Sequence, residues 1–353
     1  MSVGSLIAPR LIDGVGHIRT FAALASLASA AALLHLSFVD PWVWIAVRSL
    51  TGFAFAGLII VTESWLNASV SSAQRGRLLA IYGMAGMAAG AVGQFLLNLG
   101  DPATFTLFVL VSILMSLALV PISLARVEGP APEEKQALPS LRRLWRLSPY
   151  GAVAAALVGA SIGTFYGLAP LFAQELGYSQ SNIASLIALF TMGGLLLQFP
   201  LGWMSDRVSR RGMGISIALA GALLMLISVA IPPPPAAILM AISFAIGGIV
   251  LPAQAIAVAH VNDRAPSSTR VAVSGELVML QGIGAVFGPL LVGALMDWQG
   301  ARGLPIGLAL LQGAIVAWGL MRVAIRSDPE TRERHAARPL IDMLSADPAL
   351  MVG

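Results

Sequence analysis

Ten apolar stretches, each about 20 residues long, run through this sequence and are separated by short polar segments. A helix of that length spans the hydrocarbon core of a bilayer, and in lipid only helices and closed barrels satisfy their own backbone hydrogen bonds. The pattern therefore predicts an all-α polytopic membrane protein. The expected spans cover residues 20–39, 42–63, 77–98, 103–125, 150–172, 182–203, 213–231, 236–259, 271–296 and 304–325.

Composition supports this prediction and excludes several classes of function. Charged residues make up 11% of the chain and hydrophobic residues 57%, whereas soluble domains carry about 25% charged residues. The net charge of +4 does not indicate nucleic-acid binding, because the basic residues lie in short loops between apolar spans. We expect no cofactor and no metal, since the chain has no cysteine and its histidines lack metal-ligand spacing.

Enzymatic activity is not expected either. Lys135 is the only lysine, and no phosphate-binding loop contains it, which excludes ATP hydrolysis by such a loop. A membrane enzyme would need His, Asp and Glu side chains clustered at a helix end, and the sequence contains no such cluster.

One long polar stretch divides the spans into four before it and six after it. Shorter turns separate other spans, for example at Asp40-Pro41 and Asp101-Pro102. We predict four parts: an N-terminal helical half (1–125), a central cytoplasmic loop (126–149), a C-terminal six-helix half (150–326) and a cytoplasmic tail (327–353).

The basic residues indicate the orientation of the chain in the membrane. Nineteen of the 21 Lys and Arg residues fall on one side of the predicted bilayer, Arg302 falls on the other side, and Arg48 lies inside a span. By the positive-inside rule, the arginine-rich side faces the cytoplasm. The central loop and the C-terminus are therefore expected to be cytoplasmic, in a bacterial cytoplasmic (inner) membrane.

The two halves repeat each other at a nearly constant offset. Arg75 and Arg270 both precede a span and lie 195 residues apart, as do Gly93 and Gly288. Parallel six-helix repeats are typical of secondary transporters. In the first half this offset places one helix and most of a second before Met1. We therefore expect about 10 of 12 helices to be present and about fifty N-terminal residues to be missing. The alternative is a complete ten-helix protein with an amphipathic N-terminal segment.

Residues 202–211 read Gly-Trp-Met-Ser-Asp-Arg-Val-Ser-Arg-Arg. This segment resembles the loop signature of the Major Facilitator Superfamily, Gly-x-x-x-Asp-Arg-x-Gly-Arg-Arg. It lies in the expected cytoplasmic loop and departs from the family pattern at Ser209. A degraded first-half copy keeps fewer of its residues. The segments 63–67, 75–77 and 260–264 resemble a bacterial permease branch of the family. The resemblance implies the family's fold and a gating role for Gly202, Asp206, Arg207, Arg210 and Arg211, with Asp13, Gly16 and Arg19 in the first copy.

The chemistry of the loop motif fits such a gate. The Asp206 carboxylate follows the predicted helix end and is expected to face helix N-termini, where unpaired N–H groups stabilise negative charge. Arg207, Arg210 and Arg211 are expected to pair with carboxylates or helix C-termini across the seam between the halves. The alternative is that these residues only form a turn and set topology.

Three ionisable residues lie in or at the ends of predicted spans. Arg48, whose segment resembles a helix-four signature of the family, is about 10 Å deep, and leaving a charge in lipid costs at least about 2.5–3.5 kcal/mol. Arg48, Glu63 and Glu276 are therefore candidates for coupling. For Glu276 a salt bridge to the loop arginines and a proton-carrying role are both open, and Glu63 has Arg75 and Arg77 as candidate partners.

Small residues recur at helical spacing in two spans. Gly86, Gly90 and Gly93 form one row, and Gly284, Gly288 and Pro289 the other. Such rows let helices approach closely, and a Gly-Pro pair bends a helix. Both packing and sliding during transport are open. Where the first copy of the family motif often has Pro, this chain has Gln94, which weakens an antiporter interpretation.

Polar side chains inside the spans suggest a mildly polar central cavity, because each needs a partner or water in lipid. The candidates are Gln94, Asn98, Tyr166, Gln198, Gln254 and Gln281. We expect a monomeric secondary transporter, embedded in the lipid bilayer, that moves a small-molecule substrate by alternating access, with proton coupling open. The alternatives are a transport-incompetent truncated product and a transporter-like membrane sensor or binding protein.

Overall fold

The structure is a computed structural model that describes residues 11–12, 14–38, 40–68, 72–101, 103–124, 140–230, 234–266 and 269–325. Within these residues ten helices contain 19 to 30 residues each, and no strand is present. Each of these helices coincides with one predicted span. The prediction of an all-α polytopic fold is confirmed.

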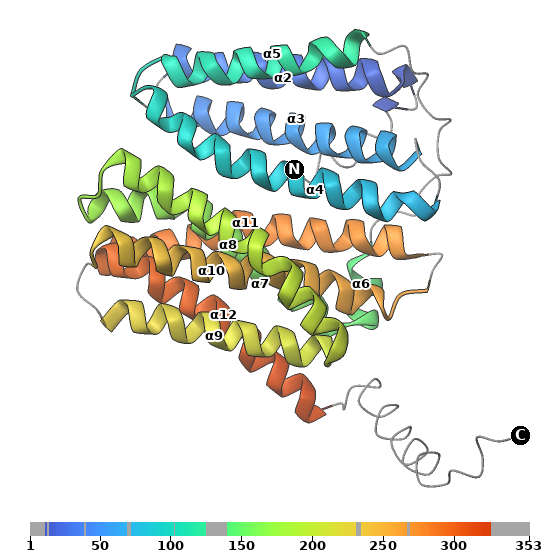
Figure 1. Ribbon diagram of the computed structural model, residues 1–353, viewed down its shortest axis with the longest axis vertical. Helices are drawn as coiled ribbons and strands as arrows, with labels where there is room; N and C mark the ends of the chain where they lie inside the picture. The colour runs from blue at the N-terminus through green and yellow to red at the C-terminus, as the bar shows by residue number, and fades with distance from the viewer. Residues whose placement is uncertain are drawn as a thin grey trace, which may run out of the picture. The chain divides into compact units, whose positions relative to one another are not determined.

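The first four long helices precede the central loop. They are α2 (His17–Ser37), α3 (Pro41–Ala68), α4 (Ser72–Phe95), which continues into the short η1 (Leu96–Leu99), and α5 (Thr106–Leu124). Helix α2 packs against both α3 and α5, and Figure 1 shows the three side by side.

The remaining helices follow the central loop. A short helix, α6 (Leu141–Leu147), leads into α7 (Pro149–Glu175), and α8 (Gln180–Arg207) and α9 (Arg210–Ala230) come next. The described part of the chain ends with α10 (Ala236–Asn262), α11 (Arg270–Gln299), the short η3 (Gly300–Arg302) and α12 (Gly303–Ile325). Helix α7 packs against α10, α11 and α12, and α9 packs against α10 and α12.

The repeat predicted from the sequence is visible in the helices. The first residues of α2 and α9 are 193 positions apart, and those of α3 and α10 are 195 apart. The packing repeats as well: α2 contacts α3 and α5, and α9 contacts α10 and α12. The chain also forms two compact units, one of Met1–Leu138 with Gly177–Leu195 and one of Pro139–Leu176 with Leu196–Gly353.

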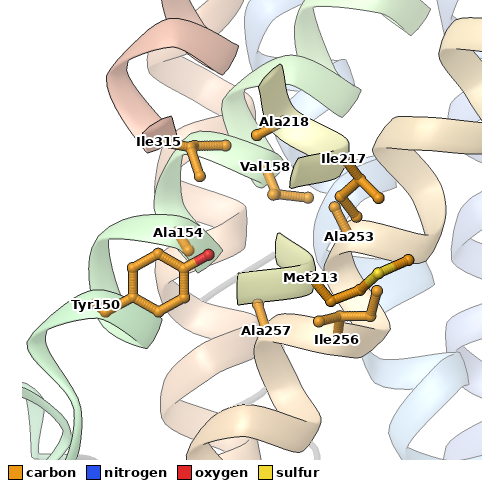
Figure 2. Packing of buried hydrophobic residues seen from close by; sticks show 10 residues of the cluster. All are labelled: Tyr150, Ala154, Val158, Met213, Ile217, Ala218, Ala253, Ile256, Ala257 and Ile315. Atoms are coloured by element: carbon orange, nitrogen blue, oxygen red, sulfur yellow. The ribbon is translucent and has the colours of Figure 1, made fainter. Parts of the chain in front are cut away.

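Side chains from four helices form the main core of the second unit. Figure 2 shows them pointing toward one another from α7, α9, α10 and α12. Most are small or aliphatic, which allows close helix packing in a protein whose outer surface is also apolar. The cluster consists of Tyr150, Ala154, Val158, Met213, Ile217, Ala218, Ala253, Ile256, Ala257 and Ile315.

The outer surface is apolar, as a lipid-embedded protein requires. Eight stretches among the described residues are long and apolar enough to cross a membrane, one of which contains both α11 and α12. Only 6% of the 18-residue apolar stretch in α5 is buried inside the structure. Large side chains such as Phe199 and Trp298 are about four-fifths exposed. Lipid tails can cover such a surface, whereas water would penalise it.

Polar residues at the predicted turns cap the helices. The Asp40 carboxylate accepts hydrogen bonds from the backbone N–H groups of Trp42 (2.9 Å) and Val43 (3.1 Å) at the start of α3. The Ser148 hydroxyl accepts one from Gly151 N–H (3.0 Å) at the start of α7. These contacts satisfy N–H groups that have no partner inside the helix, so each helix begins at a defined residue.

Candidate functional site

The loop motif forms a charged network where α8 ends and α9 begins. The Arg210 guanidinium contacts Asp206 Oδ1 at 2.9 Å through Nη2, and its Nε donates to Asp263 Oδ2 at the end of α10. One arginine therefore ties the ends of the three helices α8, α9 and α10 together. All three residues lie in the second unit.

One detail of the sequence interpretation is wrong. Asp206 was expected to follow the helix end and face helix N-termini, but α8 continues to Arg207 and Asp206 lies in its last turn. Its carboxylate instead pairs with Arg210, four residues further along the chain. Polar residues extend α8 beyond its apolar stretch, so apolar length alone does not predict where the helix ends. In this last part of α8 the guanidinium carbon of Arg207 lies 3.1 Å from the ring centre of Trp203, an attractive cation–π contact.

Ser209, which departs from the family pattern, has a local role. Its hydroxyl accepts a hydrogen bond from Gly212 N–H (3.3 Å), so it caps the start of α9. Arg211 is half-buried. Gly202 lies in α8, and a Cβ atom there would meet no described atom within 4 Å. Pairing of the motif arginines across the two halves stays a prediction.

Glu276 is fully buried near the start of α11 and binds the central loop. Its Oε1 accepts hydrogen bonds from Ser140 N–H (2.7 Å) and from Arg143 Nε (3.0 Å), and Arg143 Nη2 also contacts it. Beside this pair, Leu144 is 0% exposed and packs with residues of α7, α10 and α11, such as Val261 and Leu277. The short helix α6 is thus held against the second unit by an ion pair and by a buried leucine.

Two of the six predicted cavity residues form a hydrogen bond with each other. The Gln254 side-chain amide on α10 donates to Gln281 Oε1 on α11 at 3.0 Å, and Gln281 Nε2 is buried without a partner among the described residues. In the same unit, Gln312 Nε2 donates to Ser161 Oγ at 3.0 Å, a pair the sequence did not single out. Each contact joins two helices of the second unit through polar side chains.

The other four candidates differ in how far they are exposed. Gln94 is half-buried on α4, Asn98 is exposed in η1, and Tyr166 and Gln198 are exposed on α7 and α8. That these four residues line a common cavity with Gln254 stays a prediction.

The second glycine row lies at the contact between α7 and α11. A Cβ atom at Gly284 would overlap the backbone oxygen of Ala156, and one at Gly288 would lie 2.8 Å from Ala160 Cα and from Thr164 Oγ1. Pro289, next to Gly288, lies inside α11 and would contact a Cβ at Gly167 at 3.7 Å. Close backbone contact therefore depends on the absence of side chains at these positions.

The first glycine row has no such neighbour among the described atoms. A Cβ at Gly86, Gly90 or Gly93 on α4 would meet nothing within 4 Å in the described part of the chain. The two rows match in sequence position but differ in surroundings within their own units. Helix α7 packs closely on α11 in the second unit, whereas the described helices of the first unit make no comparable contact with α4. A packing role for the first row stays a prediction.

Several predicted residues lie before or in the first helices. Asp13 falls outside the described residues. Gly16 immediately precedes α2 with φ +85°, and its carbonyl accepts from Thr20 N–H (3.1 Å) and Thr20 Oγ1 (2.8 Å). Arg19 and Arg48 are exposed, with no hydrogen bond or ion pair recorded to a described residue. Glu63 is exposed within α3, and the side chains of Arg75 and Arg77 are not described.

The first unit contains polar contacts that the sequence interpretation missed. His17 Nε2 lies 3.1 Å from Ser64 Oγ, which joins α2 to α3. Ser29 on α2 contacts Ser112 Oγ (2.8 Å) and Ser116 Oγ (3.1 Å) on α5. Serines three or four residues apart share a helix face, so the Ser112 and Ser116 spacing was an available signal. No group of three or more potential metal ligands occurs among the residues described.

Comparisons with known proteins agree with this architecture. Residues 1–172 and 151–352 each match the model of the Major Facilitator Superfamily. An uncharacterized MFS-type transporter of Yersinia pestis (strain Pestoides F) is 28% identical over 301 residues, which cover 84% of this chain and 76% of the relative. The MFS-type transporter YcaD of Escherichia fergusonii gives the same identity and coverage.

Two solved transporters share the fold. A mutant of the nucleoside transporter NupG superposes with a TM-score of 0.70 at 14% identity, covering 92% of this chain and 88% of that one. The fucose:proton symporter FucP of E. coli gives a TM-score of 0.57 at 14% identity and covers 91% of this chain and 87% of its own.

Proposed function

The chain belongs to the Major Facilitator Superfamily, and we propose that this secondary transporter moves a small polar solute by alternating access between two repeated helical halves. The observation that most supports a polar solute is the hydrogen-bonded amide pair of Gln254 on α10 and Gln281 on α11. Side-chain amides both donate and accept, so they suit hydroxyl, amide or ring-nitrogen groups of a neutral ligand.

The network of Asp206, Arg210 and Asp263 supports a role in gating. It lies on the arginine-rich side of the protein and joins the ends of α8, α9 and α10. Charge-assisted hydrogen bonds at such a rim stabilise one arrangement of the helix ends and must be exchanged when those ends move apart. The arginines of this motif would then favour the state in which the cytoplasmic side is closed.

Proton coupling is a finer proposal that concerns Glu276. Its carboxylate is fully buried, it has one arginine partner, and its Oε2 has no partner among the described residues. A buried carboxylate in a span can take up a proton when its arginine partner is withdrawn. The competing role is a permanent ion pair that anchors α6.

Reconstitution tests the proposed function. The purified protein is first screened for thermal stabilisation by nucleosides, sugars and organic acids, with uridine and fucose as the first probes. A stabilising compound is then tested for counterflow in proteoliposomes, with protein-free liposomes as the control. We expect accumulation of labelled solute against an unlabelled internal pool. Stabilisation without counterflow would contradict transport and favour the membrane sensor or binding protein.

A further inference from the structure

The short helix α6 presents a basic and aromatic face away from the helix bundle. Its inward face is occupied: Arg143 is bound to Glu276, and Leu144 is 0% exposed. Arg142, Trp145 and Arg146 are exposed, and their spacing of three and four residues places them on one face of the helix. Because α6 is held on its other side, this face has a fixed direction.

The C-terminal part of α12 continues this face. The rings of Trp145 and Trp318 lie 5.9 Å apart, and the Trp318 indole N–H donates to Pro149 O at 3.1 Å, which fixes the second ring. Arg322 lies one turn beyond Trp318 on α12. The contact between the two tryptophans therefore joins the α6 row to the Trp318–Arg322 row.

The arginines of this face have no acidic partner in the described part of the chain: the structure records no ion pair there for Arg142, Arg146 or Arg322, and the recorded pairs use Arg143 and Arg210. Next to Arg322, large apolar side chains such as Leu320 (55% exposed) and Val323 (46% exposed) point away from the bundle. The face thus combines positive charge that has no described acidic partner, two tryptophans and an apolar helix surface.

We propose that Arg142, Trp145, Arg146, Trp318 and Arg322 form a binding site for the headgroup of an anionic phospholipid in the leaflet on the arginine-rich side. Tryptophan rings favour the membrane–water interface, and arginines there attract anionic headgroups. The guanidinium groups bind the lipid phosphate, and the acyl chains lie along the exposed apolar side of α12. Together with the Glu276 anchor, the bound lipid holds α6 at the membrane surface.

Native mass spectrometry of the purified full chain in non-ionic detergent tests the site. Phosphatidylglycerol and phosphatidylcholine are titrated against wild type, R142Q/R146Q/R322Q and R142K/R146K/R322K. Each arginine near an anionic surface contributes about five-fold in affinity. We therefore expect wild type to prefer phosphatidylglycerol, the glutamine variant to lose that preference, and the lysine variant to keep most of it.

R302Q is the matched control, since Arg302 is predicted to lie on the opposite side of the membrane, and it should bind both lipids as wild type does. The single variants R142Q, R146Q and R322Q serve if the triple variant does not fold, and each should lose about five-fold. An unchanged preference in the glutamine variants would overturn the proposal and leave the face to a soluble acidic partner. Displacement of the lipid by inorganic phosphate would also overturn it.

Discussion

Glu276 illustrates at the scale of one residue how a carboxylate is accommodated in an apolar span. Burying an unpaired charge costs several kcal/mol, and a partner repays that cost only with good hydrogen-bond geometry. Here Arg143 and the backbone N–H of Ser140 both donate to the same oxygen. Removal of one partner is therefore much more costly than removal of both.

A double-mutant cycle should reveal this asymmetry. Arg143→Ala leaves the Glu276 charge buried and unpaired, so we expect a loss of about 3 kcal/mol or more in the free energy of unfolding. Glu276→Gln in the Arg143→Ala background should recover a large part of that loss, because it removes the buried charge. Thermal unfolding in detergent measures both effects. Equal melting temperatures for Arg143→Ala and wild type would contradict the pair.

Gly16 provides a second prediction at this scale. Its φ of +85° is unfavourable for any residue with a Cβ atom, although no described atom lies within 4 Å of that position. Gly16→Ala should therefore reduce stability by about 1 kcal/mol through backbone strain alone. Gly14→Ala is the matched control, because its surroundings are equally open and its φ is not in the left-handed range. A shared melting temperature for the two variants would contradict this explanation.

At the scale of the helix, the contact between α7 and α11 depends on glycines of both helices, a row on α7 and the second glycine row on α11. Gly159 and Gly163 on α7 face Gln281 and Ala285, and Gly284 on α11 faces Ala156. The neighbouring atoms are backbone atoms, which cannot turn aside as a flexible side chain can. A single added methyl group must therefore push the helices apart.

Substitution of glycines within α11 should separate packing from helix propensity. Gly284→Ala is expected to lower the melting temperature clearly, because its Cβ would overlap the Ala156 carbonyl oxygen. Gly282→Ala lies two residues away with nothing within 4 Å, so it should be neutral or gain up to about 1 kcal/mol from better helix propensity. Similar losses in both variants would refute close packing as the cause.

The helices could be predicted from the sequence far better than their contacts. Apolar length and turn residues placed all ten long helices, because these properties are local. The choice of Arg143 among the loop arginines as the partner of Glu276 depends on how α6 docks, which no local pattern contains. The glycine rows make the same point, since matching sequence positions on α4 and α11 have different neighbours.

At the scale of the whole molecule, the repeated packing and the predicted placement of basic residues on one side of the membrane have the same origin. Helices α2, α3 and α5 in the first unit make the contacts that α9, α10 and α12 make in the second. Each repeat keeps its arginines at the same helix ends, as with Arg75 and Arg270. A repeated unit inserted in one direction places these ends on one membrane face.

The predicted orientation can be tested directly, because the chain has no cysteine and single cysteines need no altered background. Val208 lies between α8 and α9 and is exposed, and Ser179 lies between α7 and α8 and is exposed. In intact cells a membrane-impermeant maleimide should label Ser179→Cys and leave Val208→Cys unlabelled until the membrane is permeabilised. Inverted vesicles should give the opposite result. Labelling of both positions from the same side would refute the six-helix repeat, because α8 could not then cross the membrane between them.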